Sequence, residues 1–229
     1  MAVNRSEGST AMSRVPRGTL SRERIVDAAL ELIDESGTEA LSMPKLARHL
    51  GVGVMSLYTH VDNKDDLLDT VVQRVLVSLP PPTGDGWDER IRSHFGALRD
   101  AFLAHPGLGT VFTTKNVAID AVLDLLEANL AELTGAGIPD DEAVHLYYAM
   151  LTYTLGFVAW EIPRAQALPP DEYARRWRAT IDTTTTATHP TLHRLVDTLV
   201  SVASPSQYDD GLRRLTSSID AAPDRSASR

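Results

Sequence analysis

Apolar residues recur along most of the chain at spacings of three and four positions, which places them on one face of an α-helix. Before the run Pro80–Pro82, this period and the residues that favour helix ends predict four helices. Their expected ranges are 22–36, 43–50, 54–60 and 64–79. The expected N-caps are Ser21, Ser42 and Asn63, and the expected stops are Gly37 and Gly51.

The rest of the chain keeps the helical period. Its expected helices cover residues 87–104, 116–133, 140–160, 171–181, 190–202 and 207–219. A short piece follows the break at His105–Gly107, and Pro163, Pro169 and Pro170 predict a loop. No segment alternates with a period of two for long enough to form a convincing strand. The fold class is therefore expected to be all-α, with about nine or ten helices.

The composition of the 229 residues is that of an ordinary globular protein, with 43% hydrophobic and 23% charged residues. The absence of cysteine excludes disulfides, thiolate zinc sites and cysteine nucleophiles. No run of 18 apolar residues occurs, so we expect no helix that spans a membrane. The N-terminus also lacks the apolar segment of a secretion signal, and a cytoplasmic protein is expected.

The net charge of −9 at first argues against a nucleic-acid partner. The charge is unevenly distributed, however. The segment Leu41–His60 contains Lys45 and Arg48 but no acidic residue, and the polar stretch 1–18 adds Arg5, Arg14 and Arg17 against Glu7 alone. An acidic protein with this distribution can still present a local basic face to DNA.

The segment Leu41–Leu68, LSMPKLARHLGVGVMSLYTHVDNKDDLL, has the proportions of a helix-turn-helix. Two short helices flank the turn Gly51–Gly53, with the small Ala47 where the helices must cross. Val52 and Leu57 are apolar where the second helix must dock on the first. In such a unit the second helix enters the major groove while neighbouring groups hold phosphates.

Ser21–Leu68 strongly resembles the DNA-binding domain of the tetracycline-repressor (TetR) family over about 48 residues. The matching spacings are carried by Ala28–Ala29, Gly37, Leu46–Ala47, Leu50–Val52, Leu57–Tyr58, His60–Val61, Asn63–Lys64 and Leu67–Leu68. A looser resemblance to the family's C-terminal domain covers about Trp87–Ile219. The resemblance implies a helix-turn-helix domain over 19–68 and a ligand-binding and dimerisation domain over 69–220. The polar composition of the two ends predicts a flexible basic arm over 1–18 and a polar tail over 221–229.

The resemblance also implies roles for single residues in DNA binding. Tyr58 and Lys64 match positions that commonly contact phosphates, and Ser42 and Lys45 lie where the second helix faces the backbone. The base-facing positions are Val54, Met55, Ser56 and Thr59, with His60 near the end of the recognition helix. Pro44 replaces an arginine with which the tetracycline repressor reads a base, so a different operator is expected. Arg14 and Arg17 are expected to assist in the minor groove.

The resemblance further implies a homodimer, formed through the helices near Asp140–Trp160 and at the C-terminal end, with its two recognition helices about 34–36 Å apart. Double-stranded operator DNA and a small-molecule inducer are the expected partners, and the protein is expected at the nucleoid. The expected inducer is apolar or amphipathic. Its candidate contacts are His94, Leu98, Phe102, Tyr147 and Trp160.

Plainer interpretations stay open for several of these residues. His94 can be a hydrogen-bonded core histidine, and Tyr147 and Trp160 can belong to the core or to the dimer interface. His189 and His193 lack a third ligand nearby, so no metal site and no cofactor are expected. No catalytic motif occurs, so an enzyme is not expected. The alternative function is a helical interaction module whose degenerate helix-turn-helix no longer binds DNA.

Overall fold

The computed structural model describes residues 20–114, 120–167, 169–200 and 205–220. Within these ranges the chain forms eleven α-helices and one short 3-10 helix, and it contains no strand. The all-α expectation is therefore confirmed. The basic arm, the polar tail, Arg14 and Arg17 lie outside the described residues.

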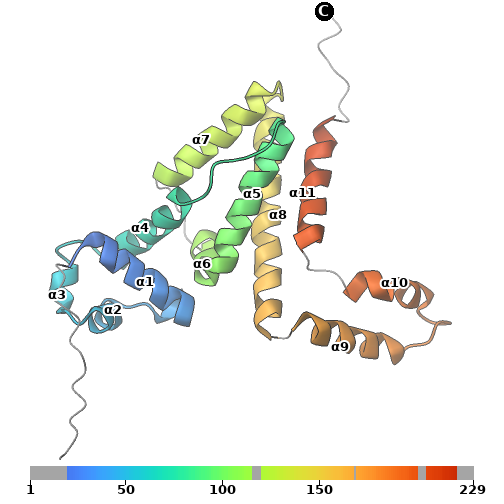
Figure 1. Cartoon of the computed structure of the whole chain (residues 1–229), viewed down its shortest axis with the longest axis horizontal. Helices are drawn as coiled ribbons and strands as arrows, with labels where there is room; N and C mark the ends of the chain where they lie inside the picture. The colour runs from blue at the N-terminus through green and yellow to red at the C-terminus, as the bar shows by residue number, and fades with distance from the viewer. Residues whose placement is uncertain (1–19, 115–119, 168, 201–204, 221–229) are drawn as a thin grey trace, which may run out of the picture.

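Helices α1 (Arg22–Ser36), α2 (Met43–Leu50) and α3 (Val54–Leu57) form the N-terminal unit, at the blue end of Figure 1. The Ser21 and Ser42 side chains accept hydrogen bonds from the backbone N–H groups of Arg24 and Lys45, as expected for N-caps. Gly51 ends α2 with a φ of 68°, a left-handed conformation that glycine adopts without a Cβ penalty. These local signals fix the helix-turn-helix directly from the sequence.

Helix α4 (Lys64–Val77) begins beside α3 and extends toward the C-terminal helices (Figure 1). Asn63 caps it by accepting from the N–H groups of Asp65 and Asp66 at 2.8 and 3.0 Å. The helix packs on α1 and on α7 (Asp120–Gly135). One continuous element therefore joins the N-terminal unit to the rest of the molecule.

The C-terminal core is built by α5 (Trp87–Ala104), α8 (Asp140–Ala167) and α11 (Pro205–Asp220), which pack on one another. Tyr208 of α11 is 1% exposed and bridges all three helices. Its hydroxyl donates to the Phe95 carbonyl at 2.9 Å and shares a hydrogen bond with the Thr154 hydroxyl at 2.8 Å. Burial raises the pKa of Tyr208, so the phenol stays protonated as this bonding requires.

An ion pair joins α5 to α8 near the same place. Arg99 binds both carboxylate oxygens of Glu161 at 3.0 and 2.6 Å, with side chains only 8% and 13% exposed. The guanidinium also lies over the rings of Tyr208 and Phe157 at 5.1 and 5.8 Å. A buried arginine held in this way has both its charge and its donors matched.

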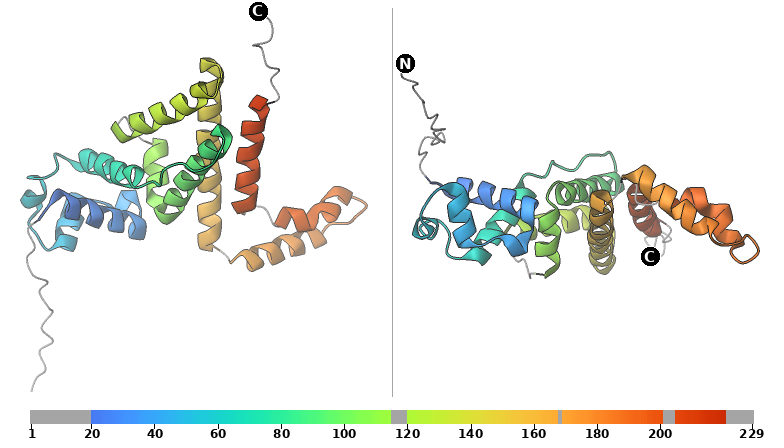
Figure 2. Two further views of the ribbon diagram at one scale, coloured as in Figure 1. Left: turned by 45° about the horizontal axis from the view of Figure 1, so that its top comes forward. Right: turned by 90° about the horizontal axis from the view of Figure 1, so that it is seen from below.

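Helices α9 (Pro170–Asp182) and α10 (Pro190–Val200) form an antiparallel pair that projects from the body, as the two views of Figure 2 show. They pack on each other. Among the described side chains of this pair, Ile181 is buried, whereas Trp177, Leu192 and Leu195 remain partly exposed.

Several predicted boundaries were wrong. The third helix ends at Leu57 rather than at residue 60, and α4 ends at Val77 rather than at 79. A nine-residue helix, α6 (Pro106–Thr114), occupies the short piece after His105. Helix α8 continues past Pro163, where a loop was expected. The ion pair of Arg99 with Glu161 ties the turn before this proline to α5. The count of eleven helices exceeds the nine or ten expected.

Candidate DNA-binding surface and ligand cavity

Helix α3 presents an outward face of mixed apolar and hydroxyl groups. Met55 is 77% exposed and Tyr58 is 44% exposed, whereas Leu57 is fully buried and anchors the helix. The turn before α3 is tied to α2 by a 3.0 Å hydrogen bond from the Val52 N–H to the Ala47 carbonyl. The exposed side chains are therefore held on a fixed base.

The other predicted DNA contacts surround this face. Ser42, Ser56 and Thr59 are exposed, and Lys45, Val54, His60 and Lys64 are half-buried. Some of their polar groups already have partners in the protein. The Ser42 hydroxyl caps α2, the Thr59 hydroxyl donates to the Ser56 carbonyl at 2.8 Å, and Lys64 Nζ donates to the Thr38 carbonyl at 3.2 Å.

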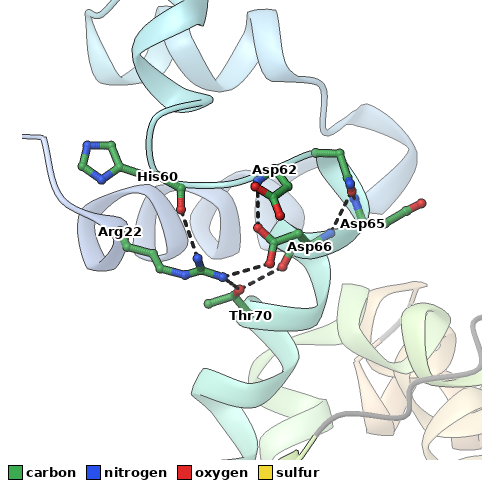
Figure 3. Close-up of polar contacts among 7 residues, drawn as sticks. Arg22, His60, Asp62, Asp65, Asp66 and Thr70 are labelled. Atoms are coloured by element: carbon green, nitrogen blue, oxygen red, sulfur yellow. Dashed lines mark hydrogen bonds and ion pairs between the residues drawn. The ribbon is translucent and has the colours of Figure 1, made fainter.

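Arg22, at the start of α1, ties the end of the recognition segment to α4 (Figure 3). Its guanidinium donates to the His60 carbonyl at 3.0 Å, to Asp66 Oδ1 at 2.9 Å and to the Thr70 hydroxyl at 2.7 Å. The second Asp66 oxygen accepts from the Asp62 N–H at 2.9 Å. These groups, called the Arg22 clamp below, fix the exit from α3 relative to α4.

A cavity of about 460 Å³ lies between the C-terminal end of α4, the proline-rich connection, α5 and α7. Most of its wall is apolar. The apolar lining residues are Leu76, Val77, Leu79, Pro80, Pro81, Pro82, Ile91, Ala121, Leu125 and Ala128. The polar lining residues are Arg90, His94, Asp124, Asn129 and Glu132. A concave, mainly apolar site with a few polar groups is typical of small-molecule binding.

Two buried polar side chains meet in this cavity wall, His94 of α5 and Asn129 of α7, each 5% exposed. Asn129 Nδ2 lies 2.6 Å from the Leu125 carbonyl and 3.1 Å from His94 Nε2. Burial lowers the pKa of His94 to about 4, so its imidazole is neutral near pH 7. The pair therefore offers hydrogen bonding without charge.

Arg90 and Glu132 form an ion pair at the same cavity. The Arg90 Nε and Nη2 atoms donate to Glu132 Oε1 at 3.0 and 2.5 Å, and Nη1 donates to the carbonyls of Gly84 and Asp85. This hydrogen bonding to Glu132 raises the pKa of Arg90. The cation thus has its carboxylate partner within the cavity wall, and α5 is joined to α7.

Of the five predicted ligand contacts, the structure brings only His94 to this cavity. Leu98 and Phe102 are buried in the core, with Phe102 against Phe112 at 5.3 Å. Tyr147 is buried against Phe95 at 5.7 Å, and Trp160 lies half-buried near Phe157 at 6.1 Å.

Two further hollows, of about 560 and 580 Å³, lie beside the connection and along α1 and α4. Neither is lined by any of the buried polar side chains of the described residues, which are His94, Arg99, Asn129, Thr154 and Thr216. The cavity with His94 and Asn129 is therefore the better candidate for specific recognition of a ligand.

Sequence reasoning missed Arg22, Asn129 and the lining prolines. Asn129 had a usable signal, because it is a lone amide between Leu125 and Leu133 on the apolar stripe of its helix. Arg22 gave no such signal, since an arginine in a first helical turn is ordinarily a solvated charge.

A second contact connects the N-terminal unit to the C-terminal helices. His105 Nδ1 lies 2.7 Å from Asp34 Oδ2, which joins the end of α5 to the last turn of α1. At the next turn Gly107 of α6 lies so close to α1 that a Cβ there would come within 2.3 Å of Ile33 Cγ2. Helix α6 therefore packs directly on α1.

Among the described residues, no group of three or more His, Asp or Glu side chains is placed to hold a metal ion. No helix in the described ranges is both long and apolar enough to cross a bilayer.

Comparison with known proteins identifies the family. Residues 25–71 match the model of bacterial regulatory proteins of the tetR family, and residues 79–222 match the tetracyclin repressor-like C-terminal domain. Residues 72–78, which are the last part of α4 and Ser78, lie between the two matches. Together they cover the helix-turn-helix, the Arg22 clamp apart from Arg22 itself, and the cavity lining apart from Leu76 and Val77.

Individual relatives agree with these matches. An HTH-type transcriptional regulator of Saccharopolyspora erythraea is 35% identical over 144 residues, which are 62% of this chain; the chain thus spans about three fifths (61%) of that relative's length. The class D tetracycline repressor protein of Escherichia coli is 33% identical over 168 residues, covering 67% of this chain and 74% of the repressor.

Among solved structures, ActR of Streptomyces coelicolor in complex with actinorhodin superimposes with a TM-score of 0.77 at 27% identity, covering 88% of this chain and 96% of ActR. The resemblance inferred from the helix-turn-helix motif is thereby confirmed. The chain belongs to the tetR family of bacterial regulatory proteins.

Proposed function

We propose that this protein is a ligand-responsive DNA-binding transcriptional regulator, and specifically a repressor that a small apolar or amphipathic molecule releases from its operator. One observation carries the proposal. Helix α4 holds the Arg22 clamp at its N-terminal end and lines the cavity at its C-terminal end with Leu76 and Val77. A molecule in the cavity therefore presses on the element that positions the recognition helix.

The proposed DNA surface lies on and around α3. Met55, Ser56 and Thr59 face base edges together with Val54, and the apolar members favour contact with thymine methyl groups. Tyr58, Lys45, Ser42 and Lys64 hold the phosphate backbone, with His60 at the edge of the surface. Binding to phosphate requires Lys64 Nζ to exchange its bond to the Thr38 carbonyl for a phosphate oxygen.

The proposed switch is a two-state coupling between the cavity and the operator. A ligand between α4, α5 and α7 favours one position of α4. Because the Arg22 clamp joins α4 to the end of the recognition segment, α3 moves together with α4. A coupling free energy of about 1–3 kcal/mol would change operator affinity roughly 5- to 150-fold. The actinorhodin complex of ActR supports a small molecule as the effector of this chain as well.

We further propose that the active form is a homodimer. The outward stripe of α8 is exposed and contains small or apolar residues, including Val144, Tyr148, Thr152, Gly156 and Ala159. Helix α11 lies next to α8, so both can pack against their copies around a twofold axis. Two recognition helices about 34–36 Å apart would then reach successive major grooves.

The expected location and the lack of a catalytic role follow from DNA as the partner. A regulator of operator DNA acts in the cytoplasm at the nucleoid, and its relatives are regulators rather than enzymes. We propose no catalytic role, metal or cofactor. The domain division is proposed as 19–68 for DNA binding and 69–220 for ligand binding and dimerisation.

Fluorescence anisotropy tests the proposal, using the full-length protein, labelled DNA from upstream of its own and neighbouring genes, and competitor DNA. We expect one palindromic fragment to bind tightly, with an affinity that falls steeply as salt rises. The double variant Tyr58→Ala with Lys64→Ala should lose this binding while keeping the helical circular dichroism of the parent. Equal binding of every fragment and competitor would instead favour a degenerate helix-turn-helix.

A further inference from the structure

The hydrogen-bonding capacity of the cavity follows from the orientation of the Asn129 amide. A backbone carbonyl only accepts hydrogen bonds, so the atom 2.6 Å from the Leu125 carbonyl must be the amide nitrogen. The same nitrogen lies 3.1 Å from His94 Nε2. Nε2 must therefore accept, and the proton of the neutral imidazole must sit on Nδ1.

Two polar atoms of this pair have no hydrogen-bond partner among the described residues. The hydrogen bonds of the described residues use His94 Nε2 and Asn129 Nδ2, but they use neither His94 Nδ1 nor Asn129 Oδ1. In the described part of the chain no fully buried side-chain nitrogen or oxygen lacks a partner. Nδ1 and Oδ1 therefore reach accessible space at the cavity that both residues line.

The charges around the cavity further restrict the chemical class of ligand that it can bind. Arg90 is the one cation in the lining, and Glu132 already binds it. Asp124 adds a second carboxylate, so the lining carries more negative than positive charge. An anionic ligand would lose its hydration without gaining a free cation. The apolar wall from α4 and the proline connection instead favours a ring system or another compact apolar body.

We propose that the cavity binds an uncharged, largely apolar molecule that presents a hydrogen-bond acceptor to His94 Nδ1–H and a donor to Asn129 Oδ1. A carboxamide, or a carbonyl with a neighbouring hydroxyl, has this arrangement. This inference rests on the proposed function, because it names the chemical class of the effector at the same site. It excludes carboxylates and phosphates as effectors of this cavity.

Three naphthalene derivatives of nearly equal size test the inference by equilibrium dialysis against the full-length protein without DNA. The probe 1-naphthamide offers an acceptor and a donor, 1-acetylnaphthalene offers an acceptor alone, and 1-naphthoate is an anion. We expect the amide to bind about tenfold more tightly than the ketone, and the carboxylate to bind least. A simple apolar pocket would prefer the ketone, and that order would overturn the inference.

Variants assign the two hydrogen bonds separately. Asn129→Leu should abolish the preference for the amide over the ketone, whereas His94→Phe should weaken both neutral probes. His189→Phe, at an exposed histidine just before α10, is the matched control and should leave all three affinities unchanged. An amide preference that survives Asn129→Leu would contradict the proposed contact.

A measurement on the unmodified protein keeps the inference testable if a variant fails to fold. Long-range proton–nitrogen NMR of histidine-labelled protein should identify His94 as the Nδ1–H tautomer, and 1-naphthamide should shift its Nδ1 signal. An Nε2–H tautomer would overturn the assignment. If 1-naphthamide binds as expected but leaves the operator complex intact, the proposed release mechanism fails while the ligand assignment stands.

Discussion

At the scale of single residues, the buried imidazole of His94 is neutral near pH 7. It is 5% exposed and its pKa is lowered to about 4 because protonation would place a charge in a desolvated site. Protonation would also set an Nε2–H donor against the Asn129 amide donor. The residue therefore links stability to pH.

We predict that His94 makes the folded protein less stable in mild acid. In the unfolded chain the His94 imidazole has its ordinary pKa of 6.5 and is protonated below that pH. In the folded protein the same imidazole stays neutral until about pH 4. The resulting free-energy loss is about 2 kcal/mol between pH 7 and pH 5. Urea unfolding at fixed protein concentration should show this loss in the parent and not in His94→Gln. Identical pH dependence of the two proteins would refute the prediction.

The Arg22 clamp is a second feature at the scale of single residues. It affects DNA binding by fixing the position of the recognition segment, and no change of protonation is involved. We predict that Arg22→Gln weakens operator binding about tenfold, because several charge-assisted hydrogen bonds hold the exit from α3. The slope of log affinity against log salt should stay unchanged, since the side chain is engaged with protein rather than with phosphate. Arg74→Gln, whose ion pair with Asp27 is exposed and 3.8 Å long, is the control. A slope that is smaller in magnitude by about one would instead indicate that Arg22 contacts a phosphate.

At the scale of elements, two connections join the DNA-binding unit to the cavity domain. Helix α4 is the covalent one, and the packing of α6 on α1 is the second. The second depends on Gly107, where a Cβ would lie 2.3 Å from Ile33 Cγ2 and 3.1 Å from the Ile33 carbonyl oxygen. The backbone oxygen cannot move aside as a side chain can.

We predict that Gly107→Ala lowers the free energy of unfolding by about 1–3 kcal/mol through this overlap. Gly109→Ala on the same helix is the matched control. A Cβ there meets nothing within 4 Å, so alanine should be neutral or stabilising by up to about 1 kcal/mol. Thermal unfolding of both variants measures the difference. Equal midpoints would show that α6 and α1 do not depend on this close approach.

Prediction from the sequence succeeded where signals are local. Ser21, Ser42, Asn63, Gly37 and Gly51 mark helix ends through their own side chains and backbone conformations, so the helix-turn-helix was predictable.

The cavity was not predictable in the same way. The period of α5 places His94, Leu98 and Phe102 on its inward face, but it cannot distinguish a filled core from a hollow. That distinction depends on α7 and the proline connection, which are distant in sequence.

At the scale of the whole molecule, the exposed stripe of α8 defines the proposed dimer face. Thr152 lies on that stripe and is exposed in the single chain, so a larger side chain there is compatible with the fold. We predict that Thr152→Arg gives a folded monomer, because twofold packing would bring two buried arginines together. Glu127→Arg, on an exposed position of α7, should remain dimeric. Sedimentation velocity distinguishes the outcomes, and a dimeric Thr152→Arg protein would place the interface elsewhere.

Footprinting of the preferred operator fragment with hydroxyl radicals tests the central claim most directly. A dimer with two recognition helices about 34–36 Å apart should protect two segments whose centres lie about 10–10.5 base pairs apart on one face of the DNA. The Tyr58→Ala, Lys64→Ala variant should remove both protections at the same protein concentration. A single protected segment would contradict the account that the protein binds its operator as a twofold dimer. The absence of any protection on a fragment that the protein binds would contradict it as well.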